Sequence, residues 1–224
     1  YINSQAKVGL TTGAILTRIK AASEELDILQ AGQWINTDDL RDFDDRQWVY
    51  PDINKDSLAF LQYTSGSTGD PKGVMITHWN LLENLKVIRQ SFAIESSDTG
   101  VIWLPPYHDM GLIGGILTPL YAEIPVVLIP PVHFLQKPLR WLQAITKYQG
   151  TISGGPNFAY DLCCERISDE LLPGLDLSSW KLAFNGAEMV RSQTMDNFYQ
   201  KFKKCGFQKQ AFYSCYGLAE ATLF

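Results

Sequence analysis

The sequence predicts an α/β fold in which largely parallel sheets are flanked by helices. Short apolar segments of strand length alternate along the chain with longer segments of helical periodicity, which is the order typical of βαβ units. The composition, 46% hydrophobic and 19% charged, provides a sizeable core and excludes a disordered chain, a collagen and a coiled coil. The length of 224 residues corresponds to one large domain or to about one and a half small ones.

Each predicted strand is a short apolar run, and each predicted helix repeats apolar residues at three- and four-residue intervals. The stripe Leu81, Leu85, Ile88 and Phe92 is the clearest example of the helical spacing. Between these elements, the acidic and irregular residues 38–56 are predicted to form a surface excursion. The predicted strands cover residues 7–11, 34–35, 58–63, 74–76, 101–104, 126–129, 151–152, 182–184 and 211–213. The predicted helices cover residues 14–26, 81–92, 110–121, 135–148, 157–167 and 191–204.

The charge pattern argues against two classes of partner. The chain carries 19 basic and 24 acidic residues, a net charge of −5, without a long basic run. Nucleic acid and an anionic membrane surface are therefore not expected as partners. The longest apolar runs, such as residues 124–129, are far shorter than the roughly 20 residues of a membrane span. No transmembrane segment is predicted.

The cysteines and the chain ends indicate the compartment and the extent of the protein. The four cysteines form no Cys-x-x-Cys pair and fit neither a disulfide framework nor a zinc site, so they are interpreted as reduced thiols of a cytoplasmic protein. The chain shows no signal peptide, begins with Tyr1 and ends within an apolar pattern. These features predict a piece of a longer chain. The cysteines are Cys163, Cys164, Cys205 and Cys215.

Residues 63–74, which read Tyr-Thr-Ser-Gly-Ser-Thr-Gly-Asp-Pro-Lys-Gly-Val, are the most informative segment. Glycines let successive N–H groups point into one concavity, hydroxyls add donors and Lys72 adds a positive charge, which together suit a polyphosphate. The pattern is neither a Walker A loop nor a dinucleotide fingerprint. A flexible surface turn is the alternative, but a turn needs neither four hydroxyls nor a lone lysine. The candidate phosphate-binding residues are Thr64, Ser65, Gly66, Ser67, Thr68, Gly69 and Lys72.

Along its whole length, this segment resembles the phosphate-loop signature of the adenylate-forming superfamily, which includes acyl-CoA synthetases, luciferases and adenylation domains of peptide synthetases. The resemblance implies that the loop joins two antiparallel strands and closes over the β- and γ-phosphates of ATP. It also implies a catalytic role for Lys72.

Residues 213–222 resemble the Tyr-Gly-x-Thr-Glu element of the same superfamily. The resemblance implies that Tyr216, followed by Gly217, packs on adenine and that Glu220 holds Mg²⁺, which typically takes one or two carboxylates together with phosphate oxygens. Ala219 stands where many relatives have a threonine that meets the α-phosphate. Thr222 or a water is expected to replace that contact. A turn followed by a helix is the alternative interpretation.

A third segment follows the predicted strand 182–184. Asn185, Gly186, Ala187 and Glu188 resemble the loop that contacts adenine in the superfamily. A loop after a strand of an α/β sheet is a common ligand position. A βα turn, for which Asn and Gly are ordinary residues, is the alternative.

Residues 103–112 resemble fatty acyl-AMP ligases in particular, through Trp-Leu-Pro-Pro-Tyr-His-Asp-Met-Gly-Leu. The resemblance places His108 near the fatty carboxylate and the α-phosphate, as a catalytic group that positions rather than transfers protons. One His-Asp pair cannot supply a metal site. Residues 153–159 also resemble this subfamily and are expected to line the acyl pocket. The candidate substrate-binding residues are His108, Asp109, Met110, Gly111, Gly154 and Gly155.

The resemblance implies that residues 1–224 are part of the large N-terminal domain of a fatty acyl-AMP ligase, without the small C-terminal domain. The expected reaction is ATP-dependent activation of a fatty acid to an acyl-adenylate, followed by transfer to the phosphopantetheine thiol of an acyl carrier protein, often for polyketide or lipopeptide assembly. One alternative is a fatty acyl-CoA synthetase, and another is a fragment that binds nucleotide or lipid without catalysis. The isolated 224 residues are expected to be inactive.

Overall fold

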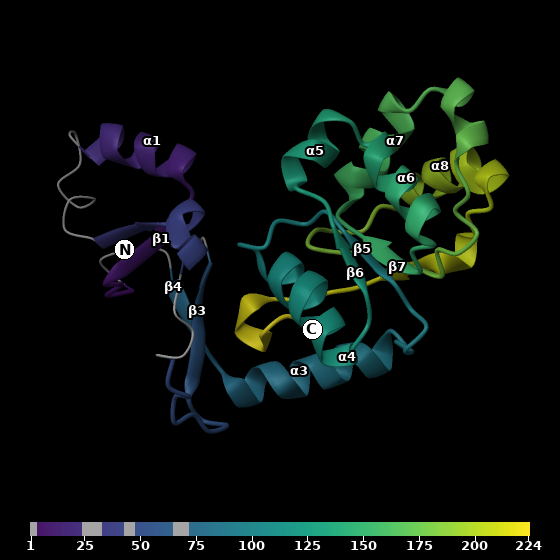
Figure 1. Ribbon diagram of the computed structural model, residues 1–224. Coiled ribbons are helices and arrows are strands. Elements are labelled where there is room, and N and C mark those ends of the chain that lie inside the picture. Colours follow the sequence, from purple (N-terminus) through teal and green to yellow (C-terminus); the bar gives the residue numbers. More distant parts are fainter. Residues whose placement is uncertain (1–3, 24–32, 43–47, 65–71) are drawn as a thin grey trace. The chain divides into compact units, whose positions relative to one another are not determined.

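The computed structural model describes residues 4–23, 33–42, 48–64 and 72–224. The chain divides into two compact units, Tyr1–Met75 and Ile76–Phe224 (Figure 1). The second unit holds most of the predicted strands and helices. Each unit is described by itself.

The first unit contains short strands and one helix. Strand β1 (Val8–Thr11) leads through α1 (Gly13–Ser23) to β2 (Gln33–Asn36), which pairs with β1 in parallel. A 3-10 helix follows at Thr37–Asp42, where sequence analysis expected an irregular excursion. Strands β3 (Leu58–Thr64) and β4 (Lys72–Thr77) then form a sheet of their own.

A five-stranded parallel sheet organises the second unit, in the order β6-β5-β7-β8-β9. Since all four strand pairings in this sheet are parallel, the predicted α/β class with a largely parallel sheet is confirmed. The carboxyl ends of all five strands lie at one edge, where ligands bind in open α/β sheets. The strands are β5 (Gly100–Ile102), β6 (Val126–Leu128), β7 (Ile152–Gly154), β8 (Leu182–Asn185) and β9 (Phe212–Ser214).

Helices cover both faces of this sheet, with α3 and α4 on one side and α6, α7 and α8 on the other (Figure 1). Helix α3 begins with a capping box, in which the Thr77 hydroxyl accepts from the Asn80 N–H at 3.1 Å and the Asn80 side chain accepts from the Thr77 N–H at 3.0 Å. The helices are α3 (His78–Ser91), a π-helix (Met110–Leu117), α4 (Thr118–Ala122), α5 (Pro131–Gln136), α6 (Leu139–Tyr148), α7 (Asn157–Arg166) and α8 (Ser192–Phe202). Short 3-10 turns lie at Asp169–Gly174, Lys203–Cys205, Lys209–Ala211 and Ala219–Ala221.

The single helix predicted for residues 135–148 is wrong, because the structure has two helices there, α5 and α6. The break lies at Pro138. A proline clashes with a helical conformation of the preceding residue, and Lys137 accordingly has φ −149° and ψ 87°. The same proline then starts α6, because its ring suits the first turn of a helix.

The helix predicted for residues 110–121 begins as a π-helix and continues as α4. The widened turns end at Thr118, whose N–H and hydroxyl both donate to the carbonyl of Ile113, five residues earlier. Gly111 allows close approach, because a Cβ there would lie 2.0 Å from the carbonyl oxygen of Pro105. π-helical turns are rare and concentrate at functional sites.

Aromatic rings dominate the core of the second unit. Trp141 and Trp180 are fully buried, with ring centroids 5.2 Å apart, and Tyr160 packs edge-on against Trp141 at 5.7 Å. The indole of Trp141 has a partner in this core: its Nε1–H donates to the Ser153 hydroxyl at 2.7 Å, and that hydroxyl donates to the carbonyl of Val101. Such pairing is needed because a buried donor without a partner is costly.

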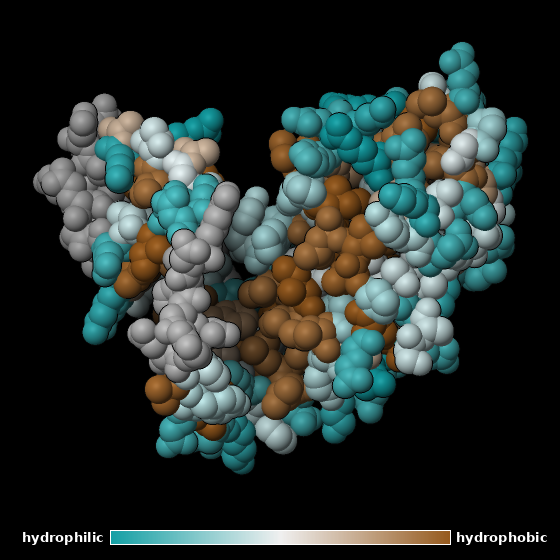
Figure 2. Space-filling model, viewed as in Figure 1, coloured by the Kyte–Doolittle hydropathy of each residue, from teal (hydrophilic) through white to brown (hydrophobic). Residues whose placement is uncertain are grey.

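Figure 2 shows a broad hydrophobic area on the visible face of the second unit. Large apolar side chains exposed in this unit include Leu120 on α4, Leu128 at the end of β6, and Val132 and Leu135 on α5. Within the described parts of the chain, no helix is both long and apolar enough to cross a membrane.

The packing of β7 against β8 predicts the effect of a substitution at Gly154. A Cβ at this position would lie 2.1 Å from the carbonyl oxygen of Phe184, and backbone on a central strand cannot move away freely. We expect Gly154→Ala to lower the free energy of unfolding by about 2–3 kcal/mol, as overpacking does. Chemical denaturation followed by tryptophan fluorescence measures the change.

Gly174→Ala is the matched control, because a Cβ at Gly174 would meet nothing within 4 Å. This variant should change the free energy of unfolding by less than about 0.5 kcal/mol. Equal stability of the two variants would contradict the packing argument.

Candidate active site

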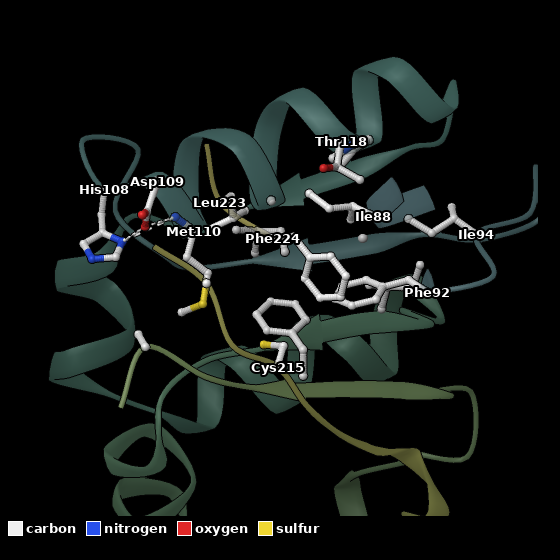
Figure 3. A pocket seen from close by; sticks show the side chains of 18 of the residues that line it. Ile88, Phe92, Ile94, His108, Asp109, Met110, Thr118, Cys215, Leu223 and Phe224 are labelled. Carbon is white, nitrogen blue, oxygen red and sulfur yellow. Dashed lines mark hydrogen bonds and ion pairs between the residues drawn. The ribbon is translucent and has the colours of Figure 1, made fainter. Parts of the chain in front are cut away.

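A cavity of about 190 Å³ lies in the second unit, against the ends of β8 and β9. It has a polar end and an apolar interior. Figure 3 shows His108 and Asp109 on one side and Ile94 on the other, with Phe92, Leu223 and Phe224 between them. The lining residues are Ile88, Phe92, Ile94, Gly100, Ile102, His108, Asp109, Met110, Gly114, Thr118, Pro119, Ile124, Ile152, Phe184, Ala187, Cys215, Tyr216, Gly217, Leu223 and Phe224.

Aromatic rings from four parts of the chain pack together at the middle of this cavity. Phe92, at the end of α3, packs edge-on against Tyr213 at 5.0 Å between centroids and against Phe224 at 6.0 Å. It also stacks on Phe184 of β8 at 6.2 Å. These contacts give a wall without charged groups, which suits an alkyl or aryl ligand because burying apolar surface is favourable.

The polar end depends on the pair His108 and Asp109. Their side chains approach to 2.7 Å between Nδ1 and Oδ1, and the same carboxylate oxygen accepts the N–H of Met110 at 2.6 Å. The hydrogen bond to Asp109 raises the pKa of His108, which burial lowers to a smaller extent. A raised pKa widens the pH range in which the imidazole is protonated, and in either form the ring presents polar N–H and N groups at this end of the cavity. The His108 side chain is 54% exposed and therefore accessible to a ligand.

A tight turn carries Tyr216 and Glu220. The N–H of Leu218 donates to the carbonyl of Leu223 at 3.0 Å, and Gly217 lies so close to that carbonyl that a Cβ would be 1.9 Å from its oxygen. Tyr216 is 81% exposed, and Glu220 is exposed as well. Thr222 is only 5% exposed and has φ 75°. The turn thus presents a tyrosine ring and a carboxylate while it buries the threonine.

The loop after β8 lies beside the end of β9. The N–H of Cys215 donates to the carbonyl of Asn185 at 2.9 Å, and a Cβ on Gly186 would lie 2.7 Å from the Cys215 sulfur. Ala187 follows with φ 68°, a left-handed conformation that non-glycine residues rarely adopt. This geometry brings the predicted adenine loop and the Tyr216 turn to one rim.

Hydrogen bonds of two buried asparagines, Asn157 and Asn185, hold the loop after β8 in place. Asn185 donates through Nδ2 to Oδ1 of Asn157 at 3.0 Å, and that oxygen also accepts the N–H of Arg191 at 3.0 Å. The Asn157 Nδ2 donates to the carbonyl of Met189 at 2.9 Å. Both asparagine side chains are fully buried, so Asn185 serves the loop rather than facing the cavity.

The structure brings part of the predicted site together. His108, Asp109, Met110, Ala187, Tyr216 and Gly217 all line the cavity. Gly154 and Gly155 do not line it: their missing side chains make room for Phe184 and for the Trp103 ring. Residues of the predicted site that lie outside the lining are Gly111, Gly154, Gly155, Asn185, Gly186, Glu188, Glu220 and Thr222.

The predicted phosphate loop lies for the most part outside the described residues. Of its candidates, Ser65, Gly66, Ser67, Thr68 and Gly69 fall there. Thr64 ends β3 and Lys72 begins β4, so the described ends of the segment are two paired strands, as the resemblance implies for this loop. The role of these residues stays a prediction.

Sequence analysis missed the residues that form most of the wall. Ile88 and Phe92 belong to the apolar stripe that predicted α3, and a stripe alone does not distinguish a core contact from a ligand contact. Leu223 and Phe224 were assigned only to an apolar pattern at the end of the chain. The apolar stripe of α3 and the apolar residues at the end of the chain were the only signals for this wall in the sequence. That both segments line one cavity depends on tertiary structure, which neither segment indicates by itself.

Glu220 was the predicted magnesium ligand. In the described ranges, no group of three or more His, Cys, Asp or Glu side chains is arranged to hold a metal ion. A lone exposed carboxylate nevertheless fits Mg²⁺, because this ion usually keeps several waters and takes one or two carboxylates together with substrate phosphates.

An open parallel sheet with a largely apolar cavity that reaches the ends of β8 and β9 is the architecture of a ligand-binding α/β domain. The chain belongs to the family of AMP-binding enzymes, since the model of that family matches residues 3–224. It is 52% identical over 177 residues to the medium-chain-fatty-acid–[acyl-carrier-protein] ligase TtuA of Teredinibacter turnerae, covering 79% of this chain and 28% of TtuA. It is 45% identical over 222 residues to the ligase JamA of Moorena producens, which has the same description, covering 99% of this chain and 38% of JamA.

Solved structures show the same relationship. The fatty acyl-adenylate ligase of Legionella pneumophila, in complex with acyl adenylate and pyrophosphate, matches with a TM-score of 0.92 and 50% identity. The match covers 99% of this chain and 38% of that one. The chain therefore spans between a quarter and two fifths of the length of these relatives.

The contact between His108 and Asp109 predicts a titration. Because the hydrogen bond and charge of Asp109 raise the pKa of His108, its imidazole should titrate above the ordinary value of about 6.5. Asp109→Asn keeps an acceptor for the Met110 N–H but removes the charge, so it should lower the midpoint. NMR titration of the His108 imidazole signals in the unmodified protein and in Asp109→Asn measures both midpoints. An unchanged His108 midpoint in Asp109→Asn would contradict the assignment.

Proposed function

We propose that the chain forms the nucleotide- and acyl-binding part of a ligase that activates a medium-chain fatty acid with ATP. The observation that carries this proposal is the cavity with an apolar interior and His108 at its polar end. A fatty acid has the matching distribution, an alkyl chain with an anionic head. The names of TtuA and JamA and the acyl adenylate bound to the Legionella pneumophila ligase support the same substrate class.

In the proposed reaction a carboxylate oxygen of the fatty acid attacks the α-phosphorus of ATP. A new bond forms between that oxygen and phosphorus, the bond to the bridging oxygen breaks, and pyrophosphate leaves with the electron pair. A carboxylate is already a nucleophile, so no base or covalent enzyme intermediate is required. Alignment and charge stabilisation remain as the tasks of the protein.

The residues of this chain divide these tasks in the proposal. Lys72 and the hydroxyl and glycine residues of the loop 64–69 bind the β- and γ-phosphates, and Tyr216 packs on the adenine. The ring of His108 orients the fatty carboxylate by hydrogen bonding, and the raised pKa increases the fraction of the ring that is protonated. Ala187 and its neighbours border the nucleotide at the rim.

Glu220 is the residue of this chain that would hold Mg²⁺ in the proposal. When bound, the ion neutralises phosphate charge. The exposure of Glu220 on the 3-10 turn Ala219–Ala221 supports this role.

Further parts of the proposal concern the rest of the enzyme. Residues 1–224 would be part of an N-terminal adenylation domain that works with a smaller C-terminal domain, and the acyl group would pass to the phosphopantetheine thiol of an acyl carrier protein. A fatty acyl-CoA synthetase is the second candidate, because a putative acyl-CoA synthetase of Caulobacter vibrioides is 39% identical over 174 residues. A cytoplasmic location agrees with the free thiols of all four cysteines.

The experiment that tests the function follows the acyl group in the intact enzyme. With ATP, Mg²⁺ and fatty acids of different lengths, we expect acyl-AMP by mass spectrometry, with an optimum at medium length. Addition of acyl carrier protein should discharge the adenylate, while CoA should not. Discharge by CoA alone would favour the synthetase, and the absence of acyl-AMP with every fatty acid would contradict the proposal.

Loss of Lys72 should impair adenylate formation. The residue is the one cation of the segment 64–73, and charge-assisted bonds to phosphate are the strong ones. We expect Lys72→Ala to slow ATP–pyrophosphate exchange on the order of 10²-fold, as loss of one preorganised electrostatic donor does. Lys86→Ala is the control, since Lys86 is exposed on α3, where its ammonium lies 3.9 Å from the Glu83 carboxylate. Near-normal exchange in Lys72→Ala would refute the phosphate-binding role.

A further inference from the structure

We propose that Asn84 on α3 is a positioning residue for the acyl pocket. Its carboxamide holds the turn formed by residues 217–224, and this turn carries Leu223 and Phe224 into the wall of the cavity. The proposal rests on the function proposed above, because it assigns the cavity to the acyl group. It adds a residue that lies outside every motif of the sequence analysis.

The Asn84 side chain is 8% exposed and makes three hydrogen bonds to backbone about 140 residues away. Its Nδ2 donates to the backbone oxygen of Phe224 at 2.8 Å and to the carbonyl of Ala221 at 3.2 Å. Its Oδ1 accepts the N–H of Phe224 at 3.2 Å. Both donors and one acceptor position of the amide are therefore used, a pattern that only Asn or Gln offers.

These bonds bracket the strained part of the turn. Thr222 has φ 75° and ψ −54°, a γ-turn conformation that is strained, especially for a β-branched residue. The bond to Ala221 precedes Thr222, and the bonds to Phe224 follow it. A strained conformation persists only where its surroundings over-determine it, and Asn84 supplies contacts on both sides.

Helix α3, which carries Asn84, also forms one wall of the cavity. Residues four apart lie on one face of a helix, and Ile88, four residues after Asn84, lines the cavity together with Phe92. Asn84 therefore sets the spacing between the helical wall and the wall formed by Leu223 and Phe224. Glu220 belongs to the same turn, so the spacing of the acyl pocket and the position of the proposed magnesium ligand depend on one side chain.

The alternative is that Asn84 only fills space, and this alternative predicts a different result for an apolar substitution. If the residue only fills space under the turn, an apolar side chain of similar size should replace it. If its carboxamide positions the turn, Asn84→Leu and Asn84→Ala should behave alike. Both would leave the oxygens of Ala221 and Phe224 without their buried donor.

The test combines hydrogen exchange with kinetics of the intact enzyme. In Asn84→Leu and Asn84→Ala we expect faster deuterium uptake in the peptide that spans residues 217–224. We also expect KM for the preferred fatty acid to rise about tenfold, as the loss of one to two kcal/mol of hydrogen bonding does. The profile of activity against chain length should flatten, while KM for ATP should change less.

Asn80→Ala is the matched control on the same helix. It removes the capping box with Thr77 and lowers the stability of α3 without touching the turn. It should leave both uptake in residues 217–224 and the chain-length profile unchanged. Two results would overturn the proposal. One is unchanged deuterium uptake of residues 217–224 in the Asn84 variants, and the other is an equally flattened profile of activity against chain length in Asn80→Ala. If the unmodified enzyme activates no fatty acid, the proposed function fails. The hydrogen bonds of Asn84 are tested separately: they are refuted only if deuterium uptake in residues 217–224 is the same in the Asn84 variants as in the unmodified enzyme.

Discussion

The parallel alignment of β5, β7, β8 and β9 decides where the loops of the candidate site lie. Because these strands run in one direction, the segments that follow them leave the sheet at the same edge. Strands β7 and β8 pack closely at Gly154, where the backbone of Phe184 occupies the space that a side chain on residue 154 would need. His108, Ala187 and Tyr216 follow three different strands and reach one cavity for this reason. This close approach at Gly154 fixes the spacing of β7 and β8, the strands that lead to the loops of the site.

Two buried asparagines hold two segments of the rim by the same physical means. Asn157 binds the backbone at Met189 and Arg191 in the loop after β8, and Asn84 binds the turn at Ala221 and Phe224. An amide offers donors and an acceptor at once, so it satisfies irregular backbone that no strand or helix pairs. The rim can therefore depart from regular structure without leaving these buried groups unpaired.

Local sequence was enough to predict the alternating elements and the α/β class, because apolar runs and helical stripes depend on neighbouring residues. It failed where a single residue redirects a helix, as Pro138 does between α5 and α6. At Gly154 and Gly155 the glycine pair indicated a close approach, and the structure places Phe184 and the Trp103 ring there. Local sequence could not find Asn84 as a partner of Phe224, because that contact joins residues 140 positions apart. The motif residues His108 and Tyr216 were found because their segments resemble a known pattern, and the apolar wall between them has no such pattern.

Strain at the rim fits the chemistry proposed for the site. Ala187 and Thr222 both adopt positive φ, at 68° and 75°, which costs roughly 1–3 kcal/mol for each residue that is not glycine. The proposed reaction needs no base and no covalent intermediate, so its rate depends on how well a carboxylate and a phosphorus are aligned. Residues that fix backbone in an unfavourable but defined position therefore matter as much as those that touch the substrate. A site of this kind contains few reactive side chains, and its specificity lies in the buried contacts that hold its loops in place.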